Sequence, residues 1–178
     1  MRIISGTHKG RIINPPHNLR ARPTTDFAKE NLFNVLGNVV DFDGLDVLDL
    51  FAGTGSISYE FASRGAANVT AVEINAVHYN FIRNTAASFA MANIHPVKAN
   101  AFLYLKNCRK SFDVIFSDAP YDLERADEIV DLVLAGDLLR EGGVFIFEHS
   151  QNKDYSSRGN FVELRKYGSV YFSIFKKD

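Results

Sequence analysis

The sequence predicts an α/β fold, a doubly wound and mostly parallel seven-stranded sheet that ends in an antiparallel C-terminal hairpin. Three observations favour it. Short apolar runs alternate with helical patterns between residues 45 and 148. A glycine turn joins the first of these runs directly to a helical pattern. Two further β-rich runs close the chain without a helix between them. Such alternation is typical of parallel strands with crossover helices on both faces of the sheet.

The composition is that of one globular domain. A chain of 178 residues with 46% hydrophobic side chains can bury a substantial core. Its longest apolar runs are far shorter than a membrane span, and its N-terminus lacks the apolar segment of a signal peptide. Cys108 is the only cysteine, which excludes an internal disulfide and fits a reducing compartment. We therefore expect a cytoplasmic protein with no membrane contact.

The N-terminal stretch predicts a β-hairpin followed by a basic arm. Residues 2–5 and 11–14 are two similar β-branched runs, and the segment between them has a glycine at each end. Two prolines end the second run, because proline cannot donate to a strand ladder. Residues 1–30 hold six Lys and Arg side chains against two carboxylates, whereas the whole chain has a net charge of −1. On charge alone, a phosphate-contacting surface and an ordinary solvated hairpin fit this arm equally well.

The remaining elements follow from apolar periodicity and turn residues. A helix should begin with a cap at residues 24–26 and stop at Gly37, with Lys29 on its polar face. We expect residues 1–40 to form an N-terminal extension of hairpin, arm and helix, and residues 41–178 to form the main domain. Within the main domain, strands are expected at 45–50, 69–73, 94–97, 112–117, 143–148, 161–166 and 169–176, and helices at 56–64, 76–90, 101–108 and 124–136.

The first candidate site is the stretch from Asp49 to Gly55. Asp49 lies near the end of an apolar strand, and the two glycines of the following turn, Gly53 and Gly55, let the backbone approach a ligand closely. A dinucleotide fingerprint would need glycine or alanine three residues later, where Ser58 stands. An acid beside this turn suits a positively charged ligand better than a pyrophosphate. S-adenosylmethionine carries an ammonium and a sulfonium and no phosphate, so the turn favours it over a nicotinamide dinucleotide.

Polar residues also follow the next two predicted strands. The carboxylate of Glu73 can accept hydrogen bonds from two vicinal ribose hydroxyls or cap the helix that follows, and its register with the first turn favours the ribose. Asn100, just before Ala101, can bind an adenine edge or cap its own helix. Because the carboxyl ends of parallel strands meet at one edge of a sheet, we expect these residues to converge on one ligand.

A third signal is the loop Asp118-Ala119-Pro120-Tyr121, which follows another apolar strand. It supplies two neighbouring acceptors, the Asp118 carboxylate and a backbone carbonyl, and an aromatic face on which a base can stack. The lone pair of an exocyclic amine is delocalised into its ring and is a poor nucleophile. Two acceptors on its N–H bonds would orient that lone pair and offset the charge that develops during attack. The loop therefore indicates amine methylation, although alone it would read as an ordinary Asp-x-Pro turn.

Together these segments resemble the RsmD family of class I S-adenosylmethionine-dependent methyltransferases, Rossmann-like enzymes that methylate the N2 amino group of a guanine in 16S ribosomal RNA. The resemblance covers nearly the whole chain. It rests on the N-terminal RIISG and KGR segments, on RPTTD followed by KENLFN, on DLFAGTG and on DAPY. Two positions depart from the family pattern. Ala119 replaces the usual first proline of the catalytic loop, and Phe27 replaces an arginine that would contact phosphate.

The resemblance implies a cofactor, a partner and a set of site residues. The cofactor would be S-adenosylmethionine, no metal would be needed, and the substrate would be 16S rRNA or the small ribosomal subunit, at the guanine-966-type site. The implied catalytic residues are Asp118, Ala119, Pro120 and Tyr121. The implied cofactor residues are Asp49, Phe51, Gly53, Gly55, Glu73, Asn100 and Ala101. The implied RNA-binding residues are Lys9, Arg11, Arg20, Arg22 and Thr24.

Other functions remain open at this point. An amino-methyltransferase for adenine N6 in DNA or for a glutamine amide would use a similar loop, but Asp118 in place of asparagine and the segment 22–26 favour guanine. A non-catalytic cofactor-binding ribosome assembly factor would have no reason to keep Asp118 and Tyr121. A nicotinamide-dependent reductase is disfavoured by the missing third glycine. The five histidines show no metal-ligand spacing, and His149 fits a loop histidine better than a site residue.

Overall fold

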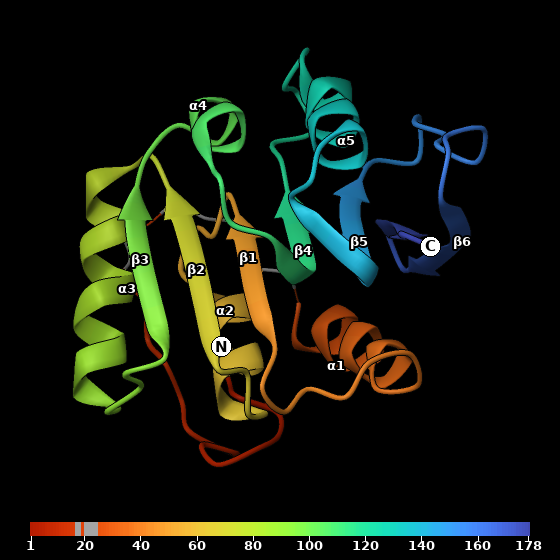
Figure 1. The fold of residues 1–178 in the computed structure, drawn as a ribbon. Coiled ribbons are helices and arrows are strands. Elements are labelled where there is room, and N and C mark those ends of the chain that lie inside the picture. The colour runs from red at the N-terminus through yellow and green to blue at the C-terminus, as the bar shows by residue number, and fades with distance from the viewer. Residues whose placement is uncertain (17–18, 20–24) are drawn as a thin grey trace.

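The computed structural model describes residues 1–16, 19 and 25–178. Its centre is a seven-stranded sheet with the strand order β3-β2-β1-β4-β5-β7-β6 (Figure 1). The strands are β1 (Asp46–Leu50), β2 (Asn68–Glu73), β3 (Ile94–Lys98), β4 (Phe112–Asp118), β5 (Leu139–His149), β6 (Phe161–Tyr167) and β7 (Val170–Lys176). The helices are α1 (Asp26–Leu36), α2 (Ser56–Ser63), α3 (Ala76–Ser88), α4 (Ala101–Asn107) and α5 (Ala126–Ala135). The predicted fold class is confirmed.

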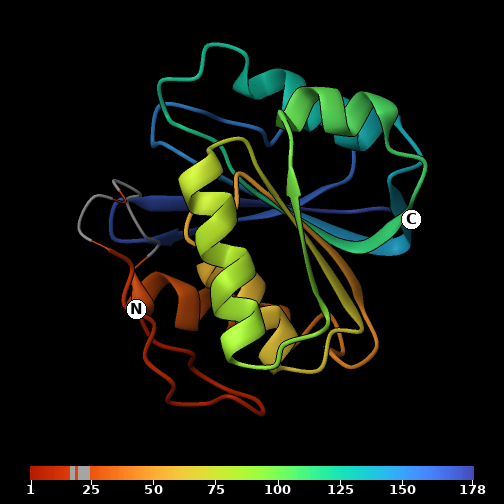
Figure 2. The same cartoon turned by 90° about the vertical axis from the view of Figure 1, so that its left-hand side faces the viewer.

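The sheet is buried on both faces, which accounts for its apolar strands. Helices α1, α2 and α3 lie on one side and α4 and α5 on the other (Figure 2). Successive side chains of a strand point to opposite faces, so Val47 packs with the first group of helices and Leu48 with the second. This two-sided burial is typical of parallel sheets whose crossovers are helices.

The strand order creates a switch point between β1 and β4. From β1 the chain moves outward through β2 and β3, and then returns to place β4 on the other side of β1. Strands β1 to β5 pair in parallel, and β7 inserts antiparallel between β5 and β6. In open α/β sheets ligands bind outside the carboxyl ends of strands at such a point. The topology therefore locates the site before any side chain is considered.

The fifth strand begins earlier than its apolar run predicts. Leu139 already pairs with Phe112, and the register then shifts so that Val144 pairs with Val114. The residues between form an irregularity in which Gly142 has φ +71° and a Cβ on Gly143 would lie 2.8 Å from the Arg140 carbonyl oxygen. Gly142 and Gly143 thus lie within the strand, at this irregularity.

The predicted N-terminal hairpin is a short antiparallel pair with an isolated bridge between Arg2 and Ile12. Ile3 and Ile13 are buried in the same cluster as the apolar side chains of α1 and α2, so this pair shares the core of the sheet. Helix α1 is capped by Thr25, whose hydroxyl accepts from the Ala28 N–H at 3.1 Å. A boundary near residue 40 stays a prediction. None of the helices in the described ranges is long and apolar enough to cross a bilayer.

One prediction about α1 is wrong. Lys29 lies on the polar face by periodicity, but its side chain is 1% exposed. The N-terminal pair and α2 cover that face, so α1 is buried on two sides. The Lys29 ammonium donates to the Arg2 carbonyl at 2.6 Å and to the Ser56 hydroxyl at 3.2 Å, and it lies 3.7 Å from the Glu60 carboxylate. Lys29 therefore belongs to the interior and not to the basic surface.

Candidate active site

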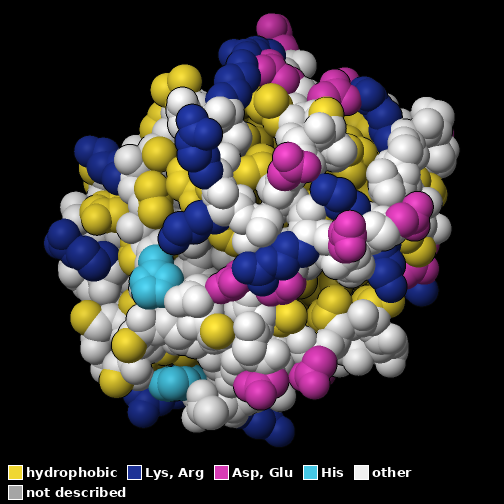
Figure 3. Space-filling model, in the orientation of Figure 1, with side chains coloured by type: hydrophobic (Ala, Val, Ile, Leu, Met, Phe, Trp, Pro, Cys, Tyr) yellow, Lys and Arg dark blue, Asp and Glu magenta, His cyan; other side chains and the backbone are white. Residues whose placement is uncertain are grey.

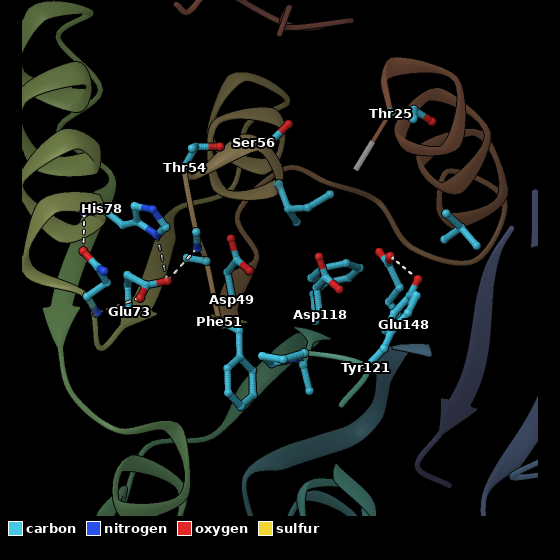
Figure 4. A pocket seen from close by; sticks show the side chains of 18 of the residues that line it. Thr25, Asp49, Phe51, Thr54, Ser56, Glu73, His78, Asp118, Tyr121 and Glu148 are labelled. Carbon is cyan, nitrogen blue, oxygen red and sulfur yellow. Dashed lines mark hydrogen bonds and ion pairs between the residues drawn. The ribbon is translucent and has the colours of Figure 1, made fainter. Parts of the chain in front are cut away.

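A cavity of about 660 Å³ opens at the carboxyl edge of the sheet. Its wall combines the ends of β1, β2, β4 and β5 with the start of α1 and the turn between β6 and β7. Figure 4 shows Glu73 on one side and Tyr121 on the other, with Asp49 and Asp118 between them. The predicted site residues that line it are Asp49, Phe51, Gly53, Glu73, Asp118, Ala119, Pro120 and Tyr121. The structure thus brings the predicted cofactor strand ends and the predicted catalytic loop together.

Glu73 is held by backbone amides at the end of β2. Its Oε2 accepts from the Gly53 N–H at 2.8 Å and its Oε1 from the Asn75 N–H at 2.7 Å. The cap of α3 is Asn75, which accepts from the backbone N–H groups of the first turn, so Glu73 is not needed for that role. An ionised carboxylate has about four acceptor sites, and two N–H bonds leave capacity for a pair of ligand hydroxyls.

Asp49 is a buried carboxyl in the floor of the cavity, with 1% of the residue exposed. The Ser58 hydroxyl donates to its Oδ2 at 2.5 Å. Burial raises the pKa of Asp49 to about 7, the charge of Glu73 adds to that rise, and the Ser58 hydrogen bonds oppose it. A cation in the cavity would favour the ionised form, because opposite charge lowers the pKa of a carboxyl.

The turn after β1 has an unusual backbone conformation. Phe51 lies in the left-handed region with φ +59°, which is uncommon for a bulky residue and occurs mostly at functional sites. Gly53 is also left-handed and lines the cavity. Gly55 has φ +83°, and a Cβ there would lie 2.9 Å from the Tyr59 ring. Gly55 therefore permits the packing of α2 against the turn and does not line the cavity.

Asn100 and Ala101 do not line this cavity either. The Asn100 side chain accepts from the backbone N–H groups of Phe102 and Leu103 at 3.0 and 3.2 Å, which makes it the cap of α4. Of the two interpretations of Asn100, the structure shows the helix cap. A contact with adenine stays a prediction.

The loop after β4 presents an acid and an aromatic ring to the cavity. Asp118 is the last residue of β4, and Ala119 beside it is buried. Tyr121 is 43% exposed, and its hydroxyl donates to Glu148 Oε1 at 3.0 Å. That hydrogen bond connects the ring to the end of β5. The loop thus places a carboxylate and an aromatic ring at the wall of the cavity.

Comparison with known proteins identifies the family. A family model described as conserved hypothetical protein 95 matches residues 1–176. A Bacillus subtilis protein called putative rRNA methyltransferase YlbH is 32% identical over 99% of both chains. Ribosomal RNA small subunit methyltransferase D of Buchnera aphidicola (subsp. Baizongia pistaciae) is 27% identical over 98% of this chain and 91% of its own.

The chain belongs to the RsmD family of methyltransferases. A solved structure described as putative methyltransferase yhhF from Escherichia coli superposes with a TM-score of 0.88 at 27% identity, covering 100% of this chain and 98% of that one. The whole fold described above is therefore that of the RsmD family, including its N-terminal pair and C-terminal strands.

Phe27 forms part of an aromatic surface at the cavity mouth. Phe27 lies in the first turn of α1, is 64% exposed and lines the cavity. Its ring meets that of Tyr167, from the end of β6, edge to face with centroids 6.5 Å apart. Phe27 therefore presents an apolar ring at the mouth of the cavity.

The predicted RNA-binding residues are only partly within the described part of the chain. Arg20, Arg22 and Thr24 lie outside it. Lys9 and Arg11 are exposed on the N-terminal pair, and the Arg11 guanidinium lies 5.0 Å from the centre of the Phe89 ring. On the face shown in Figure 3, Lys and Arg side chains are interspersed with Asp and Glu side chains.

Sequence reasoning missed one acid in the site. Glu148 is the last residue but one of β5, lines the cavity and is 5% exposed. The signal was available, because Glu148 closes an apolar strand just as Glu73 does. Its neighbour His149 is buried beside Ser173, whose hydroxyl lies 2.8 Å from Nε2, and it does not line the cavity. Among the described residues, no cluster of His, Cys, Asp and Glu could hold a metal ion.

Proposed function

We propose that this protein transfers a methyl group from S-adenosylmethionine to the N2 amino group of a guanine in 16S rRNA, at the guanine-966-type site. One observation carries the proposal: the ribose-type acid Glu73, the buried Asp49 and the loop from Asp118 to Tyr121 line the same cavity. Support comes from the names of the relatives, an rRNA methyltransferase and a small-subunit rRNA methyltransferase.

The cavity suits S-adenosylmethionine in size and donor set. Ligand pockets of this class span about 300–1,000 Å³, and this one lies within that range. The acceptor sites of Glu73 would take the ribose hydroxyls, and the carboxylate of Asp49 would balance the positive methionine end. Gly53 adds a surface without a side chain. When bound, the cofactor supplies an electrophilic methyl group.

The other half of the cavity would hold the target base. A base in a helix must leave its stack to reach such a site, at a cost of a few kcal/mol. The Tyr121 ring would stack on the base and offset part of the free energy of unstacking. Asp118 and the Ala119 carbonyl would accept from the two N–H bonds of the amine and aim its lone pair at the methyl carbon. The proton of the methylated amine would leave to Asp118 or to water.

The binding of the cofactor should depend on pH through Asp49. Because burial raises the pKa of Asp49 to about 7, this carboxyl loses its charge below neutral pH, and the affinity for the cofactor should fall by up to tenfold per pH unit towards pH 5.5. Calorimetric titration with S-adenosylmethionine between pH 5.5 and 7.5 measures this slope. Asp49→Asn should bind weakly and without the slope, and an equal slope in the variant would contradict the assignment.

The same raised pKa predicts how Asp49 affects folding. The native state holds the Asp49 proton up to about pH 7, whereas the unfolded chain releases it near pH 4. The protonated Asp49 therefore stabilises the native state relative to an ionised one at acid pH. The free energy of unfolding should fall as pH rises from 4 to 7. Asp49→Asn should gain stability relative to the wild type over that interval, which denaturant unfolding at pH 5 and pH 8 would measure.

Binding of RNA should depend on the exposed cations of the N-terminal pair. Replacing Lys9 and Arg11 together by glutamine should weaken RNA binding and lower the slope of log affinity against log salt by about 1–2. The matched control is Arg109→Gln with Lys110→Gln, two exposed cations between α4 and β4. Equal effects of the two pairs would show that the N-terminal pair has no special role.

The direct test of function is the methylation state of 16S rRNA. Mass mapping of this RNA from cells with and without the gene should show the loss of one methyl group from one guanine. Purified protein should restore it with S-adenosylmethionine, using naked rRNA and small-subunit particles in separate reactions. Methylation of an adenine or of a glutamine amide would support another amino-methyltransferase, and binding without transfer would support an assembly factor.

A further inference from the structure

One part of the cavity wall has no role in the proposed reaction. It is formed by the start of α1 and by the turn between β6 and β7. Figure 4 shows Thr25, which belongs to this part, on the side of Tyr121 and away from Glu73. The described residues that form it are Thr25, Phe27, Tyr167, Gly168, Ser169 and Val170. None of these six side chains is charged, so this wall offers no ionic partner to a phosphate.

Phe27 is a large apolar side chain that stays open to solvent in this wall. It is 64% exposed, and its ring meets that of Tyr167 edge to face with centroids 6.5 Å apart. The Tyr167 ring is half-buried and also packs on the ring of Phe172, a fully buried core residue, with centroids 6.1 Å apart. Phe27 therefore rests on a support that belongs to the core, while most of its own surface is free for a partner. A ring held in this way loses little conformational freedom on binding.

The path of an RNA chain brings its bases to this ring. A base held in the cavity remains covalently attached to a nucleotide on each side, and these neighbours must lie at the mouth. When the target base leaves its stack, each neighbour loses a stacking partner. An aromatic side chain can replace that partner, because every base has a flat π face. The cavity mouth thus brings together an exposed ring and bases that have lost a stacking contact.

We propose that the Phe27 ring stacks on the base of a nucleotide next to the target, an inference that rests on the proposed function. This contact would cover the open surface of Phe27 and hold the RNA chain on the Tyr121 side of the cavity. It would raise the affinity for RNA and leave the chemical step unchanged, because the ring does not touch the amine or the methyl group. Stacking is tolerant of sequence, so any of the four bases would serve at the neighbouring position.

The test removes the ring and the neighbouring base, singly and together. Unmethylated 16S rRNA is ligated from fragments with an abasic nucleotide directly before or directly after the target guanine, and is used naked and in small-subunit particles. Phe27→Ala should raise KM for the unaltered RNA by about 5–100-fold, the range of one lost stacking contact, with kcat unchanged. On one of the two abasic RNAs, Phe27→Ala and the wild type should agree within about twofold, because the stacking partner is already absent.

Three further variants keep the result interpretable. Phe27→Trp retains a flat ring and should keep the affinity for RNA, whereas Phe27→Leu is apolar but not flat and should lose most of it. Val39→Ala removes an exposed apolar side chain three residues beyond α1, outside the cavity wall, and should leave KM unchanged. Thermal unfolding and calorimetric titration with S-adenosylmethionine establish that each variant is folded and binds cofactor as the wild type does.

The outcomes are distinct. A loss of affinity in Phe27→Ala that disappears on one abasic RNA supports the inference. An equal loss on the unaltered and on both abasic RNAs overturns it and assigns the ring to another partner, such as a protein of the particle. No loss on the unaltered RNA, or full affinity in Phe27→Leu, also overturns it, and in all these cases the proposed function stands. If the wild type transfers no methyl group to a guanine of the unaltered RNA or particle, the proposed function and this inference both fail.

Discussion

Asp118→Ala should lower the rate of methyl transfer to rRNA by about 10²–10³-fold, the effect of removing one group that stabilises developing charge in a dry site. Asp118 ends β4 in the cavity, where it would accept from the amine and offset its positive charge during attack. Its loss should reduce kcat and leave the affinity for S-adenosylmethionine unchanged. Single-turnover transfer with radiolabelled cofactor measures the rate directly.

Two controls accompany this variant. Asp122→Ala removes an exposed carboxylate from the same loop and should leave the rate within about twofold, as expected for a surface substitution away from the site. Asp118→Asn keeps the shape but provides a weaker, neutral acceptor, so its rate should lie between those of Asp118→Ala and the wild type. A rate for Asp118→Ala within a few fold of the wild type would remove Asp118 from the catalytic role.

Lys29→Met should destabilise the protein by about 3 kcal/mol, because it removes one of the two cations that balance the buried Glu60 carboxylate and leaves that charge only partly compensated. The Glu60 side chain is fully buried at 3.7 Å from the Lys29 ammonium. Glu60 also accepts from the Ile4 and Ser5 N–H groups and from Arg64 Nε, at 2.9 to 3.0 Å. These remaining donors place the expected loss at the lower end of the range for broken buried pairs.

Denaturant unfolding measures this loss. The matched control is Lys106→Met, which breaks an ion pair with Glu128 at 2.9 Å between partly exposed side chains and should cost less than about 1 kcal/mol. The double variant Lys29→Met with Glu60→Gln should recover part of the stability, because the buried carboxylate that lost a cation is then neutral. If Lys29→Met and Lys106→Met lowered the free energy of unfolding equally, the buried ion pair would contribute no more to stability than the exposed one.

This buried network also connects the N-terminal pair to the cavity. Lys29 bonds both the Arg2 carbonyl and the Ser56 hydroxyl, and Ser56 lines the cavity at the start of α2. Burial lowers the pKa of Lys29, while the charges of Glu60 and Asp26 oppose that shift. The Lys29 ammonium lies where three segments meet, the N-terminal pair, α1 and α2.

Much of the candidate site could be predicted because it depends on strand ends. Asp49, Glu73 and Asp118 each stand at or near the close of an apolar run, and the rule that carboxyl ends of parallel strands meet at one edge is enough to bring them together. The same rule applies to Glu148, which closes the run of β5. No motif in the sequence marks that position, although the physical signal is the same as for Glu73.

Other residues could not be assigned from the chain alone. Gly55 reads as a ligand-facing glycine, but the Tyr59 ring occupies the space where its Cβ would be. From the sequence, Asn100 could be either an adenine contact or a helix cap, and its hydrogen bonds in the structure show the cap. In both cases the residue type suits either a bound ligand or a neighbouring protein segment. The packing of the following helix decides which of the two it contacts.

By itself the sequence determined the order and type of the elements, the parallel sheet and the polar strand ends, because these depend on local periodicity and on chain topology. Only the tertiary structure decided that Lys29 is buried, that β5 continues through a glycine irregularity and that Glu148 stands beside Asp118. Those facts depend on contacts between segments far apart in the chain. A helical pattern identifies the apolar face of a helix, but it does not tell whether another segment covers the polar one.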